Sequence, residues 1–366
     1  MKGKRAAVTA LRFALTGALL GVAFLLIDFH DRQVVLLHSG KKIEAVSVHR
    51  SGLEYHATLA NGEKRILREN EVKGVRDQPG LLGVLKRARL WPAMLVVPML
   101  VIVYIAQAAR WSLLLKANDF DVPLPRAVRV VWAGAFFNQI LPGSVGGDVA
   151  KALIVAKGEG RKAAVFGTVL LDRIVGLATV VMIAGFAVLP VMNRKEMIPV
   201  VGMIVALLAG GAIGAAIYFN PAIRRWRAAK NLKDRLPFRA AIEEVDDVLK
   251  TMHHAPRTIL AAVGLSALGQ VSTILGIYAL ALSLDATGVP LGDFFVFEPI
   301  IFLVTAIPIS VGGWGVEQVA YAQLFGMAGM AANTAIALSV LYKLSVLVVS
   351  LPGGVLFAAG ATKRKS

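Results

Sequence analysis

The segment Leu141-Pro142-Gly143-Ser144-Val145-Gly146-Gly147 has a related copy later in the chain, Ile307-Pro308-Ile309-Ser310-Val311-Gly312-Gly313. Each copy lies within an apolar stretch of about 30 residues, longer than the roughly 20 residues that cross a bilayer core as a helix. Proline lacks an N–H group and glycine is a poor helix former, so both interrupt a helix. Each copy therefore predicts two half-helices that meet at a bend inside the membrane, as a re-entrant hairpin. The predicted bend residues are Pro142, Gly143, Ser144, Gly146 and Gly147 in the first copy and Pro308, Ser310, Gly312, Gly313 and Gly315 in the second.

The composition of the 366-residue chain indicates a membrane protein. Hydrophobic residues make up 57% of the chain, whereas soluble domains contain about 45–50% apolar residues. Apart from the two copies, several apolar runs reach about 20 residues, which is enough to cross a bilayer core. We therefore predict an α-helical polytopic membrane protein with about six full spans plus two re-entrant hairpins. The predicted full spans are Leu11–Ile27, Trp91–Leu115, Val165–Leu189, Met197–Tyr218, Ile259–Leu284 and Ala335–Leu356.

A polar stretch after the first span predicts a small β-rich insert. Its short β-prone runs are separated by the turn dipeptides Ser39-Gly40, Ser51-Gly52 and Asn61-Gly62, and Asn-Gly is the strongest short hairpin signal. The run Leu11–Ile27 follows basic residues and precedes no small-x-small cleavage site, so it predicts an uncleaved signal anchor. The predicted domains are the signal anchor at 1–30, the β-rich insert at 31–80 and the transmembrane domain at 81–366.

The basic residues predict how the chain lies in its membrane. The formal net charge is +17, and Lys and Arg gather at both termini and in the segments Lys151–Lys162 and Arg224–Arg257. Positive charge in short loops marks the cytoplasmic side. We therefore predict a multi-pass protein of the cell's inner or plasma membrane, with cytoplasmic N- and C-termini and an extracytoplasmic β insert. Anionic lipids are the expected partner of the charge, whereas the apolar composition disfavours nucleic acid.

The number of spans between the two copies predicts their relative orientation. Three predicted spans separate the copies, and an odd number makes the two hairpins enter from opposite faces of the membrane. This arrangement is typical of an inverted repeat, in which broken helices point their ends at a central ligand site. The helix after each Gly-Gly pair begins at the bend, so its free N–H groups and positive dipole end would favour an anionic group.

Polar and ionisable residues near the bends and inside the apolar runs form the candidate substrate path, because a charge within a membrane is costly and usually functional. Lys151 and Glu317 occupy equivalent positions after the two Gly-Gly pairs. Glu298 and Lys343 lie deep in their runs, and we expect them to pair with each other or with Lys151 and Glu317. The candidate path consists of Arg110, Asn138, Asp148, Lys151, Asp172, Arg173, Glu298, Glu317 and Lys343.

Several of these features also have a purely structural interpretation. Asp148 suits the N-cap of a helix. Arg110 and the pair Asp172-Arg173 suit an ion pair or snorkelling side chains near the cytoplasmic face. Elsewhere, the four-residue spacing of Gly210 and Gly214 predicts a helix-packing face.

No motif for enzymatic chemistry is visible in the sequence. It contains no P-loop, no Gly-x-Gly-x-x-Gly after a strand and no His-Glu-x-x-His, which are the signatures of nucleotide and zinc sites. Ser144 and Ser310 have no histidine base in the predicted membrane region, which disfavours a serine hydrolase. We therefore expect no catalytic residues, no metal and no cofactor, and we expect the protein not to be an enzyme.

At its two central motifs and four shorter pieces, the sequence resembles the flippase-like transmembrane family of lysylphosphatidylglycerol synthases, which includes UPF0104-type integral membrane proteins. The pieces that carry the resemblance are Ala109-Arg110-Trp111, Asn138 to Asp148, Asp172-Arg173, Ile307 to Glu317, Leu341-Tyr342-Lys343 and Pro352-Gly353. The resemblance implies movement of a lipid between leaflets, of aminoacylated phosphatidylglycerol in some members and in hopanoid or glycolipid processes in others. No segment resembles the soluble synthase domain, so we do not expect lipid aminoacylation.

Three hypotheses about function follow. The first is a lipid translocase that moves a polar or anionic lipid through the candidate path while the acyl chains stay in the bilayer. The second is a non-transporting membrane scaffold or accessory factor in envelope lipid or glycolipid synthesis, which would contact envelope-biosynthesis proteins through the β insert. The third is an intramembrane transferase, which is disfavoured because no pair of nucleophile and base is visible.

Overall fold

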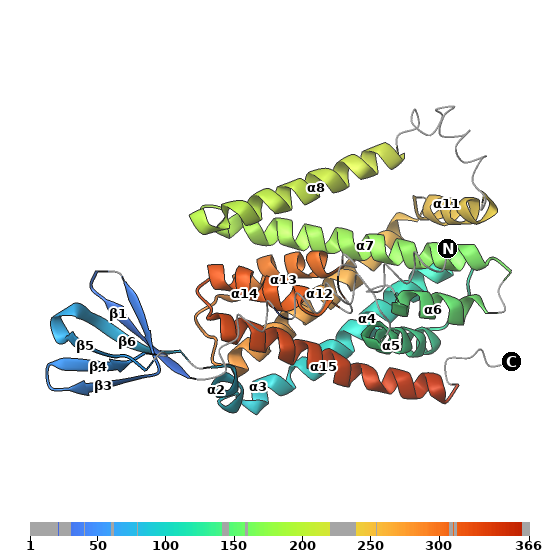
Figure 1. Ribbon diagram of the computed structural model, residues 1–366. Coiled ribbons are helices and arrows are strands. Elements are labelled where there is room, and N and C mark those ends of the chain that lie inside the picture. The colour runs from blue at the N-terminus through green and yellow to red at the C-terminus, as the bar shows by residue number, and fades with distance from the viewer. Residues whose placement is uncertain are drawn as a thin grey trace, which may run out of the picture.

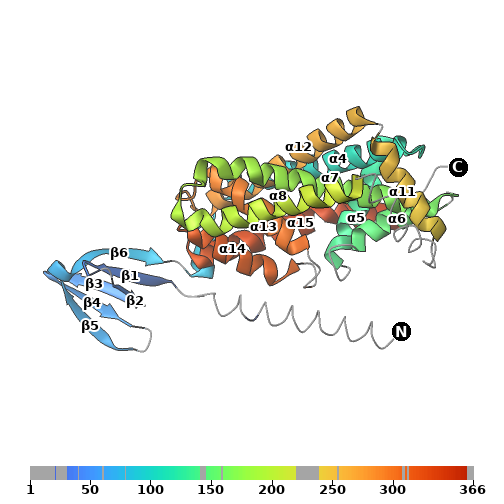
Figure 2. The ribbon, with the colours of Figure 1, turned by 90° about the horizontal axis from the view of Figure 1, so that it is seen from above.

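The computed structural model describes residues 21, 31–39, 41–59, 62–78, 80–140, 146–157, 160–219, 239–253, 255–306, 310 and 313–360. Several predictions therefore lie outside the described residues: almost all of the span Leu11–Ile27 and the bend residues Pro142, Gly143, Ser144, Pro308 and Gly312. The described chain forms a large helical part and a smaller part made of strands, which lies beyond one end of the helices (Figure 1, Figure 2).

Within the described residues, four helical stretches are long and apolar enough to cross a membrane, and each overlaps a predicted span. Two of them are the helices α12 (Pro256–Ser283) and α15 (Ala332–Ala358). The other two are Leu90–Lys116, which contains α3 (Leu90–Met94) and α4 (Val96–Lys116), and Lys162–Val191, which contains α7 (Lys162–Val188). The predicted span Met197–Tyr218 corresponds to α8 (Ile198–Phe219), whose stretch Ile198–Gly211 counts as a shorter apolar helix. The chain is thus a helical membrane protein, and the number of six spans stays a prediction.

At each Pro-Gly segment, one described helix ends before the segment and the next begins within it or just after it, whereas the bends themselves stay predictions. The helix α5 (Leu124–Ile140) ends at the first segment, and α6 (Gly146–Ala156) begins within it. The helix α13 (Leu291–Ala306) ends at the second segment, and α14 (Val316–Met327) begins just after it. Gly313 and Gly315 have φ values of 77° and 85°, in the left-handed region that only glycine adopts without strain. The glycines therefore allow the chain to turn back, and in each pair the two helices pack against one another.

The helices on either side of α8 pack reciprocally. The helix α4 lies along α12, α5 lies along α15, and α7 lies along α13. We treat α4–α7 and α12–α15 as two sets of four helices. In each set, the second helix contacts the fourth helix of the other set. In both views, α5 and α6 lie toward one end of the helical part, whereas α13 and α14 lie toward the end nearer the strands (Figure 1, Figure 2). The two helix pairs therefore lie toward opposite ends of the helical part, whereas their relation as an inverted repeat stays a prediction.

Glycine permits the closest of these helix crossings. A Cβ atom at Gly353 of α15 would collide with the backbone carbonyl of Trp132 on α5, and one at Gly147 would collide with the backbone carbonyl of Gly134. Small residues let helix backbones approach in this way. At Gly210, by contrast, no atom lies within 4 Å of the Cβ position. No described residue packs against Gly210, so the predicted packing face stays a prediction.

The β-rich insert is present as two three-stranded antiparallel sheets, ordered β2-β1-β6 and β3-β4-β5. Val35, Leu67 and Val72 form its small buried core. The stretch Ile43–Val48 belongs to two strands, which are divided at Val46. The strands are β1 (Arg32–Leu37), β2 (Lys42–Ala45), β3 (Ser47–Ser51), β4 (Glu54–Thr58), β5 (Lys64–Arg68) and β6 (Val72–Gln78).

The remaining elements connect these parts. The backbone N–H of Gly80 donates a hydrogen bond of 2.9 Å to Asp31 Oδ1 at the junction between the strands and the helices. On the outside of α7, the backbone N–H of Ala164 donates to Glu244 Oε2 of α11 over 2.9 Å. These elements are η1 (Glu69–Glu71), α2 (Leu81–Lys86), η2 (Leu189–Val191), η3 (Lys195–Met197) and α11 (Arg239–His253).

Candidate functional site

A cavity of about 380 Å³ lies in the centre of the helical part, between the two broken-helix pairs. Helices of both sets contribute to its walls, which explains why residues far apart in the sequence meet there. All nine residues of the candidate path line this cavity: Arg110, Asn138, Asp148, Lys151, Asp172, Arg173, Glu298, Glu317 and Lys343. The structure thus brings the predicted residues together, whereas their role in moving a substrate stays a prediction.

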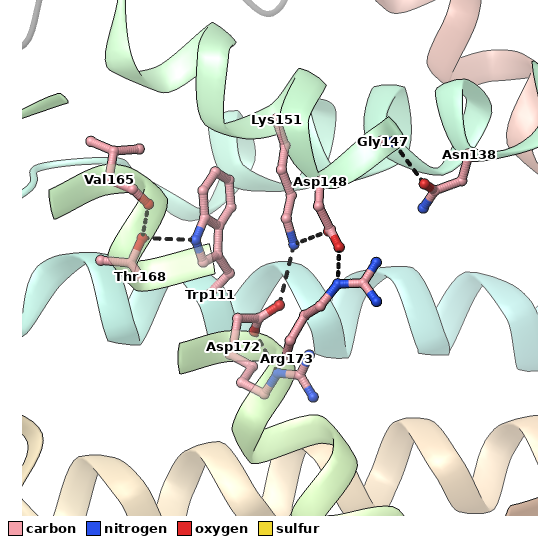
Figure 3. Close-up of polar contacts among 10 residues, drawn as sticks. Trp111, Asn138, Gly147, Asp148, Lys151, Val165, Thr168, Asp172 and Arg173 are labelled. Carbon is pink, nitrogen blue, oxygen red and sulfur yellow. Dashed lines mark hydrogen bonds and ion pairs between the residues drawn. The ribbon is translucent and has the colours of Figure 1, made fainter. Parts of the chain in front are cut away.

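Five of these residues form a connected ionic cluster, which we call the first cluster. Asp172 Oδ1 accepts a hydrogen bond of 2.7 Å from Arg110 Nε, and Asp172 Oδ2 accepts one of 3.2 Å from Lys151 Nζ. Lys151 Nζ also lies 3.0 Å from Asp148 Oδ1, and Asp148 pairs with Arg173 (Figure 3). The interpretation of Arg110 and Asp172 as an ion pair is therefore confirmed.

Most of the first cluster is buried. The Asp172 side chain is 5% exposed and that of Arg110 is 10% exposed, whereas that of Arg173 is 31% exposed. The Lys151 ammonium also lies 5.1 Å from the centre of the Trp111 ring, a cation–π distance. Buried charges are tolerated when opposite charges and hydrogen bonds compensate them. The cluster meets this condition, and Arg173 is its most accessible member.

The first amide groups after both bends are already hydrogen-bonded to side chains. The Gly147 N–H donates to Asn138 Oδ1 over 2.7 Å, and the Gly315 N–H donates to Gln318 Oε1 over 2.7 Å. These two N–H groups are therefore occupied, and the expectation that the helix ends favour an anionic group stays a prediction for their other N–H groups. A helix leaves its first N–H groups without partners inside the helix, and here the protein's own amide side chains supply partners. Asp148 serves in the ion pairs of the first cluster.

The second group of charges belongs to the other helix pair, and we call it the second cluster. It comprises Lys343 of α15, Glu317 of α14 and Glu298 of α13. Lys343 Nζ pairs with Glu317 Oε2 and lies 5.5 Å from the centre of the Trp314 ring. Of the pairings considered from the sequence, Lys343 with Glu317 is thus the one that forms. Each half of the protein therefore places one lysine over one tryptophan beside the cavity.

Several uncharged polar residues of the cavity were not singled out in the sequence. Arg110 Nη1 donates a hydrogen bond of 2.9 Å to Ser266 of α12. Gln270 and Thr273 of α12 also line the cavity. The only signal available for them is spacing, because Ser266, Gln270 and Thr273 follow one another at intervals of three and four residues and so share one face of a helix.

The pair of Glu317 and Lys343 yields a stability prediction. We expect Glu317→Gln and Lys343→Met each to destabilise the protein by roughly 3–5 kcal/mol, because each leaves a buried charge without its partner. We expect the double variant to be more stable than either single variant, since it removes both charges. Thermal unfolding of the purified proteins in one detergent measures this. A double variant that loses the sum of the two single effects would show that the residues do not interact.

Comparisons of the sequence with known proteins identify the family to which the chain belongs. The sequence profile of the family described as the lysylphosphatidylglycerol synthase TM region matches residues 77–353, a range that includes both helix pairs and every residue of the cavity wall. A UPF0104 membrane protein of Pyrococcus horikoshii is 24% identical over 300 residues, which cover 75% of this chain and 89% of that protein. No solved structure matches the chain. Because the profile matches well over half of its residues, the chain belongs to the family of the lysylphosphatidylglycerol synthase TM region.

Proposed function

We propose that the protein is a lipid translocase, which moves a polar or anionic lipid between the two leaflets of the cell's inner or plasma membrane. The observation that carries this proposal is the central cavity, where ionic clusters from both helix pairs face one another within an apolar helical protein. A lipid head group cannot cross the bilayer core unaided, because burying its charge without partners costs many kcal/mol. The cavity supplies such partners.

The head group would exchange partners with the clusters while the acyl chains stay in the bilayer. A phosphate suits this exchange, since guanidinium groups bind phosphate with paired hydrogen bonds. Arg173 is the most accessible arginine of the first cluster. The outer faces of the helices carry exposed apolar side chains such as Leu260, Phe186 and Val348, which suit contact with acyl chains. The function is therefore transport without chemical change of the lipid.

The two helix sets suit an inverted repeat, in which one half moves against the other around a fixed central site. Their reciprocal packing, with α5 on α15 and α7 on α13, is the contact pattern that a two-fold axis between the sets would generate. In this proposal both hairpins re-enter the membrane from opposite faces. The termini lie in the cytoplasm, and the strands β1 to β6 lie on the other side.

Leaflet exchange in reconstituted liposomes tests the proposal. The purified protein is placed in liposomes that carry fluorescent lipids, and a quencher that does not cross the membrane reports the lipids of the outer leaflet. We expect exchange to be faster than in protein-free liposomes for at least one of the anionic, zwitterionic and glycolipid probes. Exchange at the protein-free rate for the whole panel would overturn the proposal.

Variants of the two clusters locate the path. We expect Asp148→Asn and Glu317→Gln each to slow leaflet exchange by about ten- to a hundredfold, because each weakens charged hydrogen bonds worth about 1.5–3 kcal/mol. Asp247→Asn is the matched control, since Asp247 pairs with Lys250 and both side chains are exposed on α11. The melting temperature of each variant shows whether it is folded. Unchanged exchange in both cluster variants would place the path elsewhere.

The strands favour a second candidate function, that of an accessory factor in envelope lipid or glycolipid synthesis. Val46, Leu53 and Ile66 expose large apolar side chains on this part of the protein, and exposed apolar groups often mark contacts with other proteins. The same liposome experiment separates the two candidates, because an accessory factor has no reason to accelerate leaflet exchange. Ser substitutions at Leu53 and Ile66 would then disturb partner binding and leave exchange unchanged.

A further inference from the structure

The two ionic clusters differ in their balance of charge. In the first cluster, both carboxylates have basic partners, because Asp172 contacts Arg110 and Lys151, and Asp148 contacts Lys151 and Arg173. In the second cluster, one lysine serves two carboxylates. Lys343 pairs with Glu317, and no salt bridge to Glu298 forms among the described residues.

Glu298 is buried beside this pair and lacks a counter-charge. The residue is 7% exposed, and its Oε1 atom has no hydrogen-bond partner among the described residues. Glu317 lies within electrostatic range of the Glu298 carboxyl, and the Tyr321 hydroxyl lies close enough to interact with the Glu298 side chain, but neither group is a cation. Two carboxyl groups that share one site cannot both carry a full negative charge at low cost, so one of them holds a proton.

Groups from every neighbouring helix face the same cavity, and none of them supplies a spare cation to Glu298. Arg110 and Lys151 are engaged by Asp172, and Arg173 is engaged by Asp148. The titratable and charged groups that line the cavity around Glu298 are Tyr104 and Arg110 of α4, Asp148 and Lys151 of α6, Asp172 and Arg173 of α7, Glu317 and Tyr321 of α14, and Tyr342 and Lys343 of α15. A proton is therefore the cation available to this carboxyl group.

A proline also weakens the helix next to Glu298. Pro299 lies inside α13, directly after Glu298. Proline has no N–H group, so the helix loses one backbone hydrogen bond at this point. Glu298 thus stands on a weakened turn of the helix that ends at the second bend. A carboxyl group at such a place can face different sides of the cavity in different conformations.

We propose that Glu298 is a proton-binding site that couples lipid exchange to proton movement across the membrane. This inference rests on the proposed translocase function and adds its energy source. The Glu298 carboxylate takes a proton from water on one side, forming an O–H bond, and releases it to water on the other side. The lipid undergoes no covalent change.

An imposed pH gradient tests this coupling in the liposomes described above. For one proton per lipid, we expect the steady-state ratio of the probe lipid between leaflets to change by up to about tenfold per pH unit, because one pH unit equals a tenfold ratio of proton activity. The direction should reverse with the gradient. Glu298→Gln should make the ratio independent of the pH gradient. The control is Asp293→Asn, which changes another buried carboxyl group of α13, one that pairs with Arg194, and which should keep the dependence.

The possible results separate this inference from the proposed function. If the unaltered protein exchanges lipids but the leaflet ratio does not respond to the gradient, proton coupling is overturned and the translocase function stands. If no probe is exchanged, both are overturned. If Glu298→Gln abolished exchange of amine-bearing lipids alone and left anionic lipids coupled to the gradient, Glu298 would bind a lipid amine instead of a proton, and the proposal would fail.

Infrared spectroscopy of the purified protein in detergent provides a readout that does not depend on transport. We expect the absorption band of a protonated carboxyl group near neutral pH, which should disappear in Glu298→Gln and persist in Asp293→Asn. A band that is unchanged in Glu298→Gln would show that this residue does not hold the proton, even if exchange responds to a gradient.

Discussion

Replacing Asp172 with alanine is expected to destabilise the protein by roughly 3–5 kcal/mol, because two buried cations lose their shared partner. Arg110 Nε and Lys151 Nζ contact opposite oxygens of this carboxylate at 2.7 and 3.2 Å. Without Asp172, Arg110 keeps its contact with the Ser266 hydroxyl, and Lys151 keeps Asp148. The remaining partners do not neutralise both charges. Thermal unfolding of the purified protein in detergent measures the loss.

Two further variants separate a lost counter-charge from a lost side chain. Asp172→Asn keeps nearly the same volume and removes only the charge, so we expect most of the destabilisation to persist. The exposed pair of Asp247 and Lys250 on α11 is the control, because exposed ion pairs contribute about 0–1 kcal/mol, and Asp247→Ala should change stability little. A stable Asp172→Asn variant would contradict the view that its charge holds the cluster together.

The helix breaks could be predicted from the sequence because proline and glycine act locally. Interrupted helices at Ile140 and Ala306 follow from the residues that stand next to them. The assembly of the candidate path was predictable for a related reason, since charges are rare in apolar runs and must face the protein interior. Local chemistry and the cost of burying charge therefore explain why all nine residues meet at one cavity.

The partners within the site could not be predicted, because they depend on how distant helices pack. Arg110 meets Ser266, which lies more than 150 residues away along the chain. Lys343 could pair with Glu298 or with Glu317 as judged from the sequence, and in the structure it pairs with Glu317. The partners of the Gly147 and Gly315 N–H groups could not be predicted either, because the side chain that accepts such a hydrogen bond depends on the backbone geometry at the bend.

Glycine spacing alone does not locate the tight helix crossings, for a similar reason. Gly210 and Gly214 have the spacing of a packing motif, and yet no described atom lies within 4 Å of the Cβ position at Gly210. The tight crossing occurs instead at Gly353, whose neighbour Trp132 belongs to a helix far away in the sequence. The indole Nε1 of Trp132 also donates a hydrogen bond of 2.7 Å to the carbonyl of Val349, four residues before Gly353. The partner surface, and not the spacing, decides which glycine is indispensable.

The crossing of α5 and α15 at Gly353 gives the second large expected effect. We expect Gly353→Ala to destabilise the protein by about 3 kcal/mol or more, at the upper end of overpacking costs, because the new methyl group would collide with the backbone of Trp132 and Ala133. Backbone atoms cannot rotate away, so the two helices must separate. Since α5 and α15 both line the cavity, leaflet exchange should fall together with the melting temperature.

Two further glycine variants, at positions with less crowding, test whether the loss of stability follows the closeness of the contact. At Gly354, the added Cβ would meet the ring of Phe136 at 2.7 Å, and a side chain can yield where a backbone cannot. We therefore expect Gly354→Ala to cost less than Gly353→Ala. Gly264 of α12 has no atom within 4 Å of its Cβ position, so Gly264→Ala should stabilise the helix by roughly 0.5–1 kcal/mol. Equal melting temperatures for all three variants would mean that α5 and α15 do not approach as closely as the structure shows, and that their contact does not set the width of the cavity.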